Sequence, residues 1–275
     1  MINKKLLLIV AFISTTLIPM NAVTIFGVNS TDLFEIDTNS GAVSRVGSLG
    51  ISLNFFSGVE MTQDGTLFVR QQGGHLHTVD TTTGQATLVG SSSVGTGIIS
   101  MADLGNNTLG AVDANGFFFE INTLDGSTTE LGRINIGQQF GLASTVADTA
   151  VLDGGAIIPQ GTQITAAFGS LNFNPIGGGP INFRNQGGTG LSISIGSDGA
   201  IYSLTTGNEL NRIDGVTGER TVIATLDVSG ISSGGDILGL ASVAGDPTAT
   251  VPEPSTYAMI LFGLFAFTFY HRKNA

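Results

Sequence analysis

A stretch of fifteen residues decides the fold, because it recurs along the chain: Leu33-Phe34-Glu35-Ile36-Asp37-Thr38-Asn39-Ser40-Gly41-Ala42-Val43-Ser44-Arg45-Val46-Gly47. Residues 76–90, 118–132 and 210–224 align with it without a gap. Each copy has an apolar residue, then Asp or Asn, three free positions and Gly. The Asp side chain can accept a turn amide, and Gly adopts positive φ at little cost. The stretch therefore predicts a hairpin of two short strands.

Two more short strands precede each hairpin in the sequence. The nearer strand follows a turn dipeptide such as Asp64-Gly65 or Asp198-Gly199, and the farther strand starts at a glycine. Each repeat unit thus contains four strands. The nearer strands are expected at 25–28, 67–69, 109–112 and 201–204, and the glycine-led strands at 58–61, 97–101, 141–144 and 190–193.

The turn glycines Gly41, Gly84 and Gly126 are spaced by 43 and 42 residues, whereas Gly218 follows only after 92. The long interval predicts a hidden, degenerate copy around 173–178, with its extra residues in the stretch 148–161. A period near 43 residues with four strands per unit is typical of a β-propeller blade. The Gly-His and Trp-Asp marks of one common propeller family are missing.

The two ends of the repeat region complement each other. The first hairpin follows the strand 25–28 but has no glycine-led strand before it, and 239–243 is such a strand with no hairpin after it. Pairing the two would seal a ring and remove exposed sheet edges. We predict an all-β, β-propeller-like domain over residues 23–247, with about five four-stranded blades closed by N- and C-terminal strands. A β-sandwich, or two sheets, and a β-solenoid are the alternatives.

The composition narrows the function classes. The 275 residues include 40 glycines and no cysteine, which excludes disulfides, zinc fingers built on cysteine and thiol nucleophiles. Without the terminal segments, six basic and 20 acidic residues remain, a net charge of −14. Such a body disfavours nucleic acid and anionic lipid as partners.

The N-terminus has the pattern of a secretory signal peptide at residues 1–22. Lys4 and Lys5 precede an apolar run over 6–18, and cleavage is expected after Ala22. Met20 fits the small-residue preference before the cut poorly, so an uncleaved membrane anchor is the alternative.

The C-terminus has three ordered elements. A linker over 248–256 contains Val251-Pro252-Glu253-Pro254, an apolar run over 257–270 predicts a single transmembrane helix, and the basic tail 271–275 carries Arg272 and Lys273. This segment resembles the PEP-CTERM sorting signal of exported proteins in Gram-negative bacteria. The resemblance implies processing near Pro-Glu-Pro by an exosortase-type membrane protease, a transient inner-membrane anchor, and delivery to the cell surface or extracellular matrix.

Several residue groups could carry chemistry, and each has a simpler structural interpretation. His75 and His77 alternate along a strand and could share a metal, but no third ligand is evident, and two exposed polar positions explain them as well. The turn at 37–41 has oxygens for calcium, although turn capping explains the same pattern. Phe55-Phe56 and Phe117-Phe118-Phe119 could stack sugars, but core packing is expected. The glycine-rich stretches 177–179 and 187–188 lack a phosphate-loop context.

We therefore predict a non-enzymatic, exported binding or structural protein associated with exopolysaccharide or biofilm. No catalytic, cofactor-binding or metal-binding residue is assigned. An extracellular carbohydrate-active hydrolase or lyase that uses paired carboxylates in the propeller channel is the alternative.

Overall fold

The computed structural model of the chain shows the predicted turn in the first three copies of the repeat. In the first copy, the Asp37 carboxylate accepts hydrogen bonds from the backbone N–H groups of Asn39 and Ser40, both at 2.9 Å. Gly41 has a φ of +70° and donates its N–H to the Asp37 carbonyl at 2.8 Å. The same bond joins Gly84 to Asp80 and Gly126 to Asn122. The predicted hairpin turn is therefore confirmed in these copies, and the fourth turn lies outside the described residues.

The structure describes residues 23–242 apart from 55–56, 114, 116, 134–140, 145–148, 152–156, 160–162, 168–169, 175–181, 186–189, 197–199, 206 and 214–219. Residues 133–191 are described by backbone alone. The described residues form 22 strands and no helix. Twenty strands lie in five four-stranded antiparallel sheets, and two form a separate hairpin.

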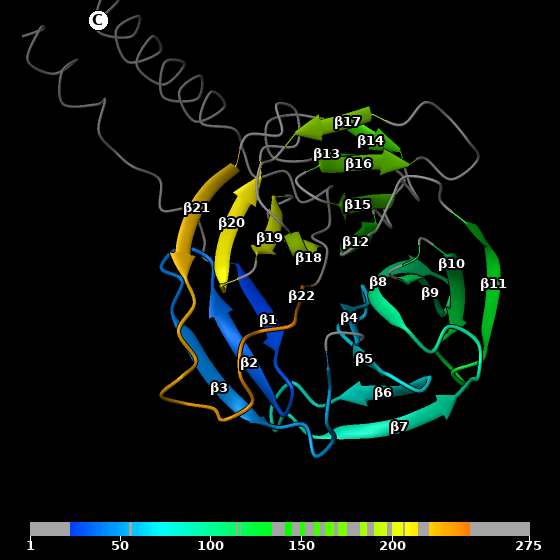
Figure 1. Cartoon of the computed structure of the whole chain (residues 1–275), viewed down its shortest axis with the longest axis horizontal. Helices are drawn as coiled ribbons and strands as arrows, with labels where there is room; N and C mark the ends of the chain where they lie inside the picture. Colours follow the sequence, from blue (N-terminus) through cyan, green and yellow to red (C-terminus); the bar gives the residue numbers. More distant parts are fainter. Residues whose placement is uncertain are drawn as a thin grey trace, which may run out of the picture.

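The five sheets stand around a common centre (Figure 1). Each has the glycine-led strand innermost and the second strand of the repeated hairpin outermost. From inside to outside, the first sheet contains β22 (Gly239–Ala241), β1 (Thr24–Val28), β2 (Asp32–Asp37) and β3 (Val43–Ser48), and the second contains β4 (Gly58–Met61), β5 (Leu67–Gln71), β6 (His75–Val79) and β7 (Ala86–Ser91). The third contains β8 (Ile98–Gly105), β9 (Thr108–Asp113), β10 (Phe117–Asn122) and β11 (Thr128–Arg133). The fourth contains β12 (Gly141–Ser144), β15 (Gln163–Ala167), β16 (Ser170–Asn174) and β17 (Asn182–Asn185), and the fifth contains β18 (Gly190–Ile195), β19 (Ile201–Thr205), β20 (Glu209–Ile213) and β21 (Arg220–Thr225).

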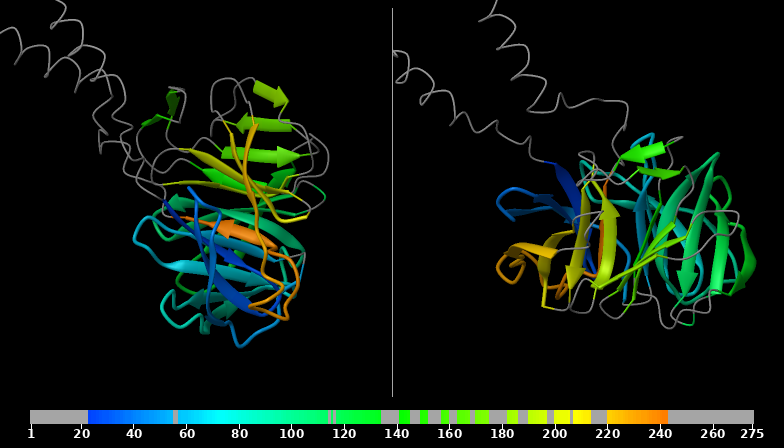
Figure 2. Two further views of the ribbon diagram at one scale, coloured as in Figure 1. Left: turned by 90° about the vertical axis from the view of Figure 1, so that its left-hand side faces the viewer. Right: turned by 90° about the horizontal axis from the view of Figure 1, so that it is seen from above.

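The innermost strands touch one another in a closed circle. β22 contacts β4, β4 contacts β8, β8 contacts β12, β12 contacts β18, and β18 contacts β22. Figure 1 looks along the axis of this circle, and the view from above in Figure 2 shows the same sheets edge-on. The predicted all-β, propeller-like architecture is confirmed.

The N-terminal sheet is completed by the C-terminal strand. β22 pairs antiparallel with β1, with Phe26 opposite Ala241 and Val28 opposite Gly239. The strand expected at 239–243 and the strand expected at 25–28 thus meet as predicted. This pairing covers the inner edge of β1 with a strand from the other end of the domain.

The hidden repeat unit also lies where the spacing places it. β16 and β17 occupy the third and fourth positions of their sheet, around the degenerate copy at 173–178. The extra residues form a short hairpin of β13 (Thr149–Val151) and β14 (Ile157–Pro159), inserted between β12 and β15.

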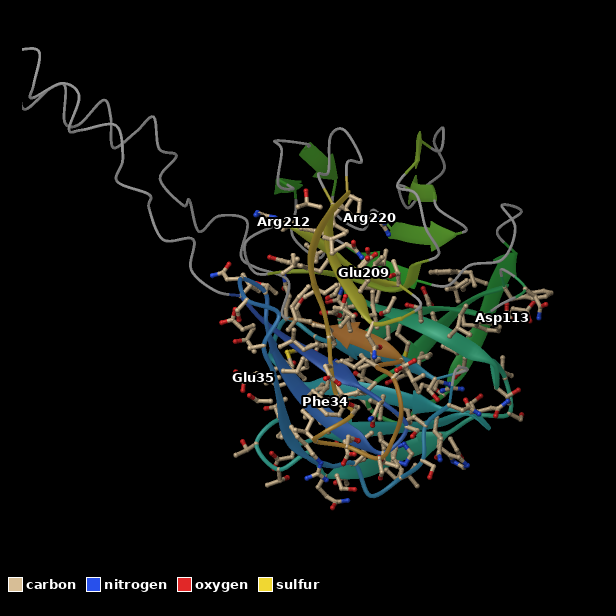
Figure 3. The ribbon with its side chains drawn as sticks, turned by 60° about the vertical axis from the view of Figure 1, so that its left-hand side comes forward. Phe34, Glu35, Asp113, Glu209, Arg212 and Arg220 are labelled. Atoms are coloured by element: carbon tan, nitrogen blue, oxygen red, sulfur yellow. The ribbon has the colours of Figure 1, made fainter. Side chains whose placement is uncertain are left out.

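Burial decreases from the centre of the ring outward. Every residue of β4 and β22 is buried, whereas the residues of the outer strands β3, β7 and β21 are half-buried or exposed, apart from Gly47. On β2, Phe34 is fully buried and its neighbour Glu35 is exposed (Figure 3). This gradient explains why the inner strands are nearly continuous in apolar and small residues, while the outer strands carry charges.

The core lies between neighbouring sheets. Ile25, Phe34 and Ile36 pack against Tyr202 and Leu210 of the preceding sheet. Similar clusters join the first sheet to the second and the second to the third. The first and second sheets thus bury both faces against their neighbours.

Glycines bring neighbouring sheets together at the outer edge. A Cβ added to Gly84, in the turn after β6, would lie 2.7 Å from the carbonyl carbon of Gly47 on β3. A Cβ added to Gly126 would lie 2.9 Å from the carbonyl carbon of Gly90 on β7. The turn glycine of one repeat therefore packs on the last glycine of the preceding repeat, so the repeated stretch specifies a contact between blades as well as a turn.

The predicted signal peptide, linker, transmembrane helix and basic tail lie outside the described residues. In the part of the chain that the structure covers, no helix has the length and apolarity needed to cross a membrane.

Candidate functional site

The innermost strands bring buried polar side chains from different repeats close to the centre of the ring. Glu60 lies on β4, Ser100 and Asp103 on β8, and Ser192 and Ser194 on β18, and each is less than a tenth exposed. Buried polar groups require hydrogen-bond partners, so these side chains either join the sheets or are available for a ligand.

Glu60 reaches from β4 to the neighbouring sheet. The backbone N–H of Asp103 donates to Glu60 Oε1 at 3.2 Å, and no described residue forms a hydrogen bond with the buried Oε2. Burial raises the pKa of Glu60 well above its usual value; the bond from the Asp103 N–H opposes this, and the negative Asp103 carboxylate adds to it. A carboxyl group that keeps its proton at higher pH can act as a general acid.

Asp103 uses one carboxylate oxygen to join the two sheets and the other within its own strand. Its Oδ2 accepts the backbone N–H of Gln63 at 2.9 Å, and its Oδ1 accepts that of Gly105 at 2.8 Å. Gln63 lies in the turn after β4 and Gly105 ends β8. Asp103 therefore positions the strand that holds Glu60.

Serines join β18 to the strand that seals the ring. The Ser194 and Ser242 hydroxyls are 2.7 Å apart, and Ser242 Oγ donates to the Ile195 carbonyl at 2.7 Å. The Leu240 N–H donates to Ser192 Oγ at 2.9 Å. These hydroxyls complete the contact between the last sheet and the first, which is a structural use.

The second sheet also holds a buried arginine. Arg70 on β5 is 1% exposed, and its Nη2 donates to the Val94 carbonyl at 2.9 Å. Burial lowers the pKa of Arg70 to about 10. Its other two guanidinium nitrogens, Nε and Nη1, have no hydrogen-bond partner among the described residues.

Sequence reasoning missed Glu60 and Arg70, although the repeat held a signal for both. Strand pairing places Arg70 at the position of Val28, Val112 and Leu204 in other sheets. It places Glu60 at the position of Ala241, Ala102 and Ser194. In each case one unit has an ionisable residue where the others have an apolar or small one.

The sequence suggested that His75 and His77 are both exposed, and His77 is not. The rings of His75 and His77 are 6.4 Å apart, but His77 is only 6% exposed, whereas His75 on the same strand is exposed. Burial and then the adjacent His75 lower the pKa of His77. Among the described residues, no group of three His, Asp or Glu side chains could hold a metal ion.

The other candidate residues have structural roles where they are described. The Asp37 carboxylate binds the turn amides, and these bonds, above all the one from Ser40, lower the pKa of Asp37. Phe118 and Phe119 are buried, as core packing requires. Phe55-Phe56 and the glycine-rich stretches 177–179 and 187–188 have no described placement.

The outer strands carry surface ion pairs. Arg220 on β21 lies 3.4 Å from Glu209 on β20 (Figure 3). Arg45 on β3 donates to Asp32 through Nη2 at 2.6 Å. Although burial acts in the opposite direction, hydrogen bonds from Ser232, Arg45 and Thr31 lower the pKa of Asp32. Because Ser232 precedes β22, this cluster also holds the segment that leads to the sealing strand.

Comparison with known protein families finds one match, at the C-terminus. Residues 250–273 match the PEP-CTERM protein-sorting motif, so the chain carries this motif as predicted. The match includes the predicted sorting residues Val251, Pro252, Glu253 and Pro254 and the basic residues Arg272 and Lys273. It leaves the rest of the chain unassigned, and no curated protein matches the chain.

Comparison with solved structures supports the fold alone. A chain of a nidogen/laminin complex superposes with a TM-score of 0.54 at 10% identity, over 80% of this chain and 97% of that one. A protein of unknown function from Bacteroides thetaiotaomicron gives 0.49 at 13% identity, over 81% and 65%. A streptogramin B lyase gives 0.39 at 12% identity, over 72% and 58%, a likeness too weak to bear on activity.

Proposed function

We propose that this chain is an exported protein that reaches the cell surface or extracellular matrix through its C-terminal signal and acts there as a non-enzymatic binding or structural component associated with exopolysaccharide or biofilm. The sorting motif at 250–273 carries the first part of the proposal. It implies recognition by an exosortase-type membrane protease and a transient membrane anchor.

The position of the motif relative to the sealing strand supports this processing. β22 ends at Ala241, and the Pro-Glu-Pro residues begin at Pro252. Cleavage near the motif would therefore remove no strand of any described sheet. The released product would be a ring proposed to have five blades, since β12 of the sheet described by backbone alone contacts β8 and β18 on its two sides.

The binding or structural role rests on how the described polar groups of the inner strands are used. Ser192, Ser194 and Asp103 hold neighbouring sheets together. A ring in which these three side chains form hydrogen bonds between sheets suits a rigid scaffold that presents loops and outer strands to a matrix polymer.

Mass spectrometry of the protein from its native host tests the processing step. The mature chain should lack the residues after the Pro-Glu-Pro motif and appear at the surface or in the medium. Glu253→Ala should keep the full-length chain in the membrane fraction, whereas the nearby acidic substitution Asp246→Ala should leave processing unchanged. A dominant species that extends to Ala275 would overturn the proposal.

Association with exopolysaccharide is tested separately. The surface form should sediment with exopolysaccharide prepared from the same host and remain soluble without it. Equal sedimentation with and without the polymer would reject this part, whatever the outcome for processing.

Glu60 favours a second candidate function, a carbohydrate-active hydrolase or lyase. A buried carboxyl group with a raised pKa beside the carboxylate of Asp103 is the kind of pair that glycoside hydrolysis uses. Product release from the host polysaccharide by the wild-type chain, and its loss in Glu60→Gln, would support the enzyme. Absence of product would leave the binding role.

A further inference from the structure

Arg70 lies in a place where the other sheets are apolar. Strand pairing aligns it with Val28, Val112 and Leu204, which are at most 1% exposed. The fold therefore does not need a charge at this position. Burying a guanidinium costs several kcal/mol unless an opposite charge and hydrogen bonds compensate.

No described acidic group provides that compensation. Arg70 forms no ion pair with a described carboxylate, and its pKa is lowered by burial without an opposing acidic neighbour. Nε and Nη1 lack partners, which leaves two of the three guanidinium nitrogens without an acceptor among the described residues.

Glu60 lies on the same face of the sheet as Arg70, but Glu60 Oε2 and Arg70 Nε and Nη1 all lack a hydrogen-bond partner among the described residues. Arg70 pairs with Gly58, and Glu60 lies two residues further along the same strand, on the same face. A Cβ on Gly58 would lie 2.7 Å from Met101 Cγ and 3.3 Å from Ile98 Cγ2. Apolar side chains of the third sheet thus pack on this face at Gly58.

The guanidinium lies beneath the segment that connects β7 to β8. Its hydrogen bond goes to the carbonyl of Val94, a residue that is 37% exposed. Arg70 Nη2 is also 3.3 Å from the position that a Cβ on Gly74 would occupy. An exposed stretch of chain thus contacts the guanidinium, and the Ser92 carbonyl oxygen occupies the space beside Gly74, 1.8 Å from where a Cβ would lie.

We propose that Arg70 forms an anion-binding site under the segment 92–97, and that the site takes a carboxylate group through the guanidinium nitrogens that have no described partner. Arginine is suited to this task because its planar donors match the geometry of a carboxylate. The proposal does not depend on the association with exopolysaccharide.

The carboxylate could belong to a small free acid or to a sugar acid, and the ligands used in the test distinguish these sources. Thermal unfolding of the full-length chain in detergent is followed with sodium acetate, with D-galacturonate and with neutral galactose at constant ionic strength. At a hundredfold excess over Kd, a bound carboxylate should raise Tm by about 5 to 11 °C. An increase with both acids assigns a general carboxylate site, and an increase with galacturonate alone assigns a sugar-acid site.

Arg70→Leu is the matching variant, because Leu204 shows that leucine fits the equivalent position. It should fold and lose the anion-dependent increase in Tm. Arg220→Leu removes a surface arginine that pairs with Glu209 and should keep the increase. The readout is the difference between variants in the same salt, so general salt effects cancel.

The same increase in Arg70→Leu as in the wild type would overturn the proposal. So would a wild type whose Tm does not change with either acid, since ordered water would then satisfy the arginine. If Arg70→Leu fails to fold, Arg70→Met provides a longer apolar replacement. Calorimetric titration of the wild type with galacturonate and acetate decides the matter without a variant, because absence of heat for both acids also rejects the site.

Discussion

Alanine substitutions at two glycines of the same sheet separate the role of the turn from the role of the contact between blades. Gly65, in the turn after β4, and Gly84, in the turn after β6, have nearly equal φ values of +84° and +81°. A Cβ added at Gly65 meets nothing within 4 Å. A Cβ added at Gly84 comes within 2.9 Å of three backbone atoms of Gly47 in the preceding sheet. Only the second substitution forces two blades apart.

The expected cost follows from these two differences in surroundings. Each alanine adopts a left-handed conformation, at a cost of about 1 to 2 kcal/mol. Gly84→Ala must also displace the backbone of β3, and overpacking of this kind costs about 1 to 3 kcal/mol more. For a domain of this size, 1 kcal/mol corresponds to about 2 to 4 °C in Tm. Gly84→Ala should therefore melt roughly 2 to 12 °C below Gly65→Ala.

Thermal and urea unfolding of both variants and of the wild type measure the difference. The urea slope should stay constant, which shows that stability and not the unfolded state has changed. Equal losses in the two variants would refute the reasoning, because the turn conformation would then account for the glycine and the contact with Gly47 would contribute nothing.

Two further predictions concern the inner strands. Leu240→Ala, at a fully buried position of the sealing strand, should lower the free energy of unfolding by about 2 to 5 kcal/mol. Leu124→Ala, at a site 71% exposed, should change it by about 0.5 kcal/mol or less. Equal melting temperatures of the two variants would contradict ring closure by β22. Because the raised pKa of Glu60 makes the folded state bind more protons, the stability of the wild type should fall as pH rises above about 4.3, relative to Glu60→Gln. The two proteins should converge below that pH, and unfolding curves that stay parallel from pH 4 to 9 would show that Glu60 ionises freely.

The repeat was sufficient to predict the sheets because each turn depends on residues next to it in the chain. Asp37 and Gly41 form their bonds within one short loop, so the same pattern identified each copy. The hidden unit was found from spacing alone, since β16 and β17 keep the period even where the residues of the repeat are degenerate.

The contacts between sheets could not be predicted in the same way. Glu60 meets Asp103, a residue 43 positions later, and Gly84 meets Gly47, 37 positions earlier. His77 was expected to be exposed because strand alternation gives the face of a residue but not what covers that face. The burial of His77 depends on tertiary packing, which the sequence of one repeat does not specify.

Departures from the repeat are therefore the most informative residues for function. Packing explains why one buried position is valine or leucine in three sheets. Packing does not explain why the equivalent position in the second sheet is Arg70, because an apolar side chain fits the fold equally well. Glu60 presents the same situation where other sheets have alanine or serine. Both lie on one face of one sheet, toward the same neighbour, although β-propellers are assembled from interchangeable units. Chance substitution at a buried position would favour small and apolar residues, since a buried charge without a partner is destabilising. Two ionisable residues with atoms that lack described partners thus lie at a single blade boundary, and the Arg70 variants test the site proposed there.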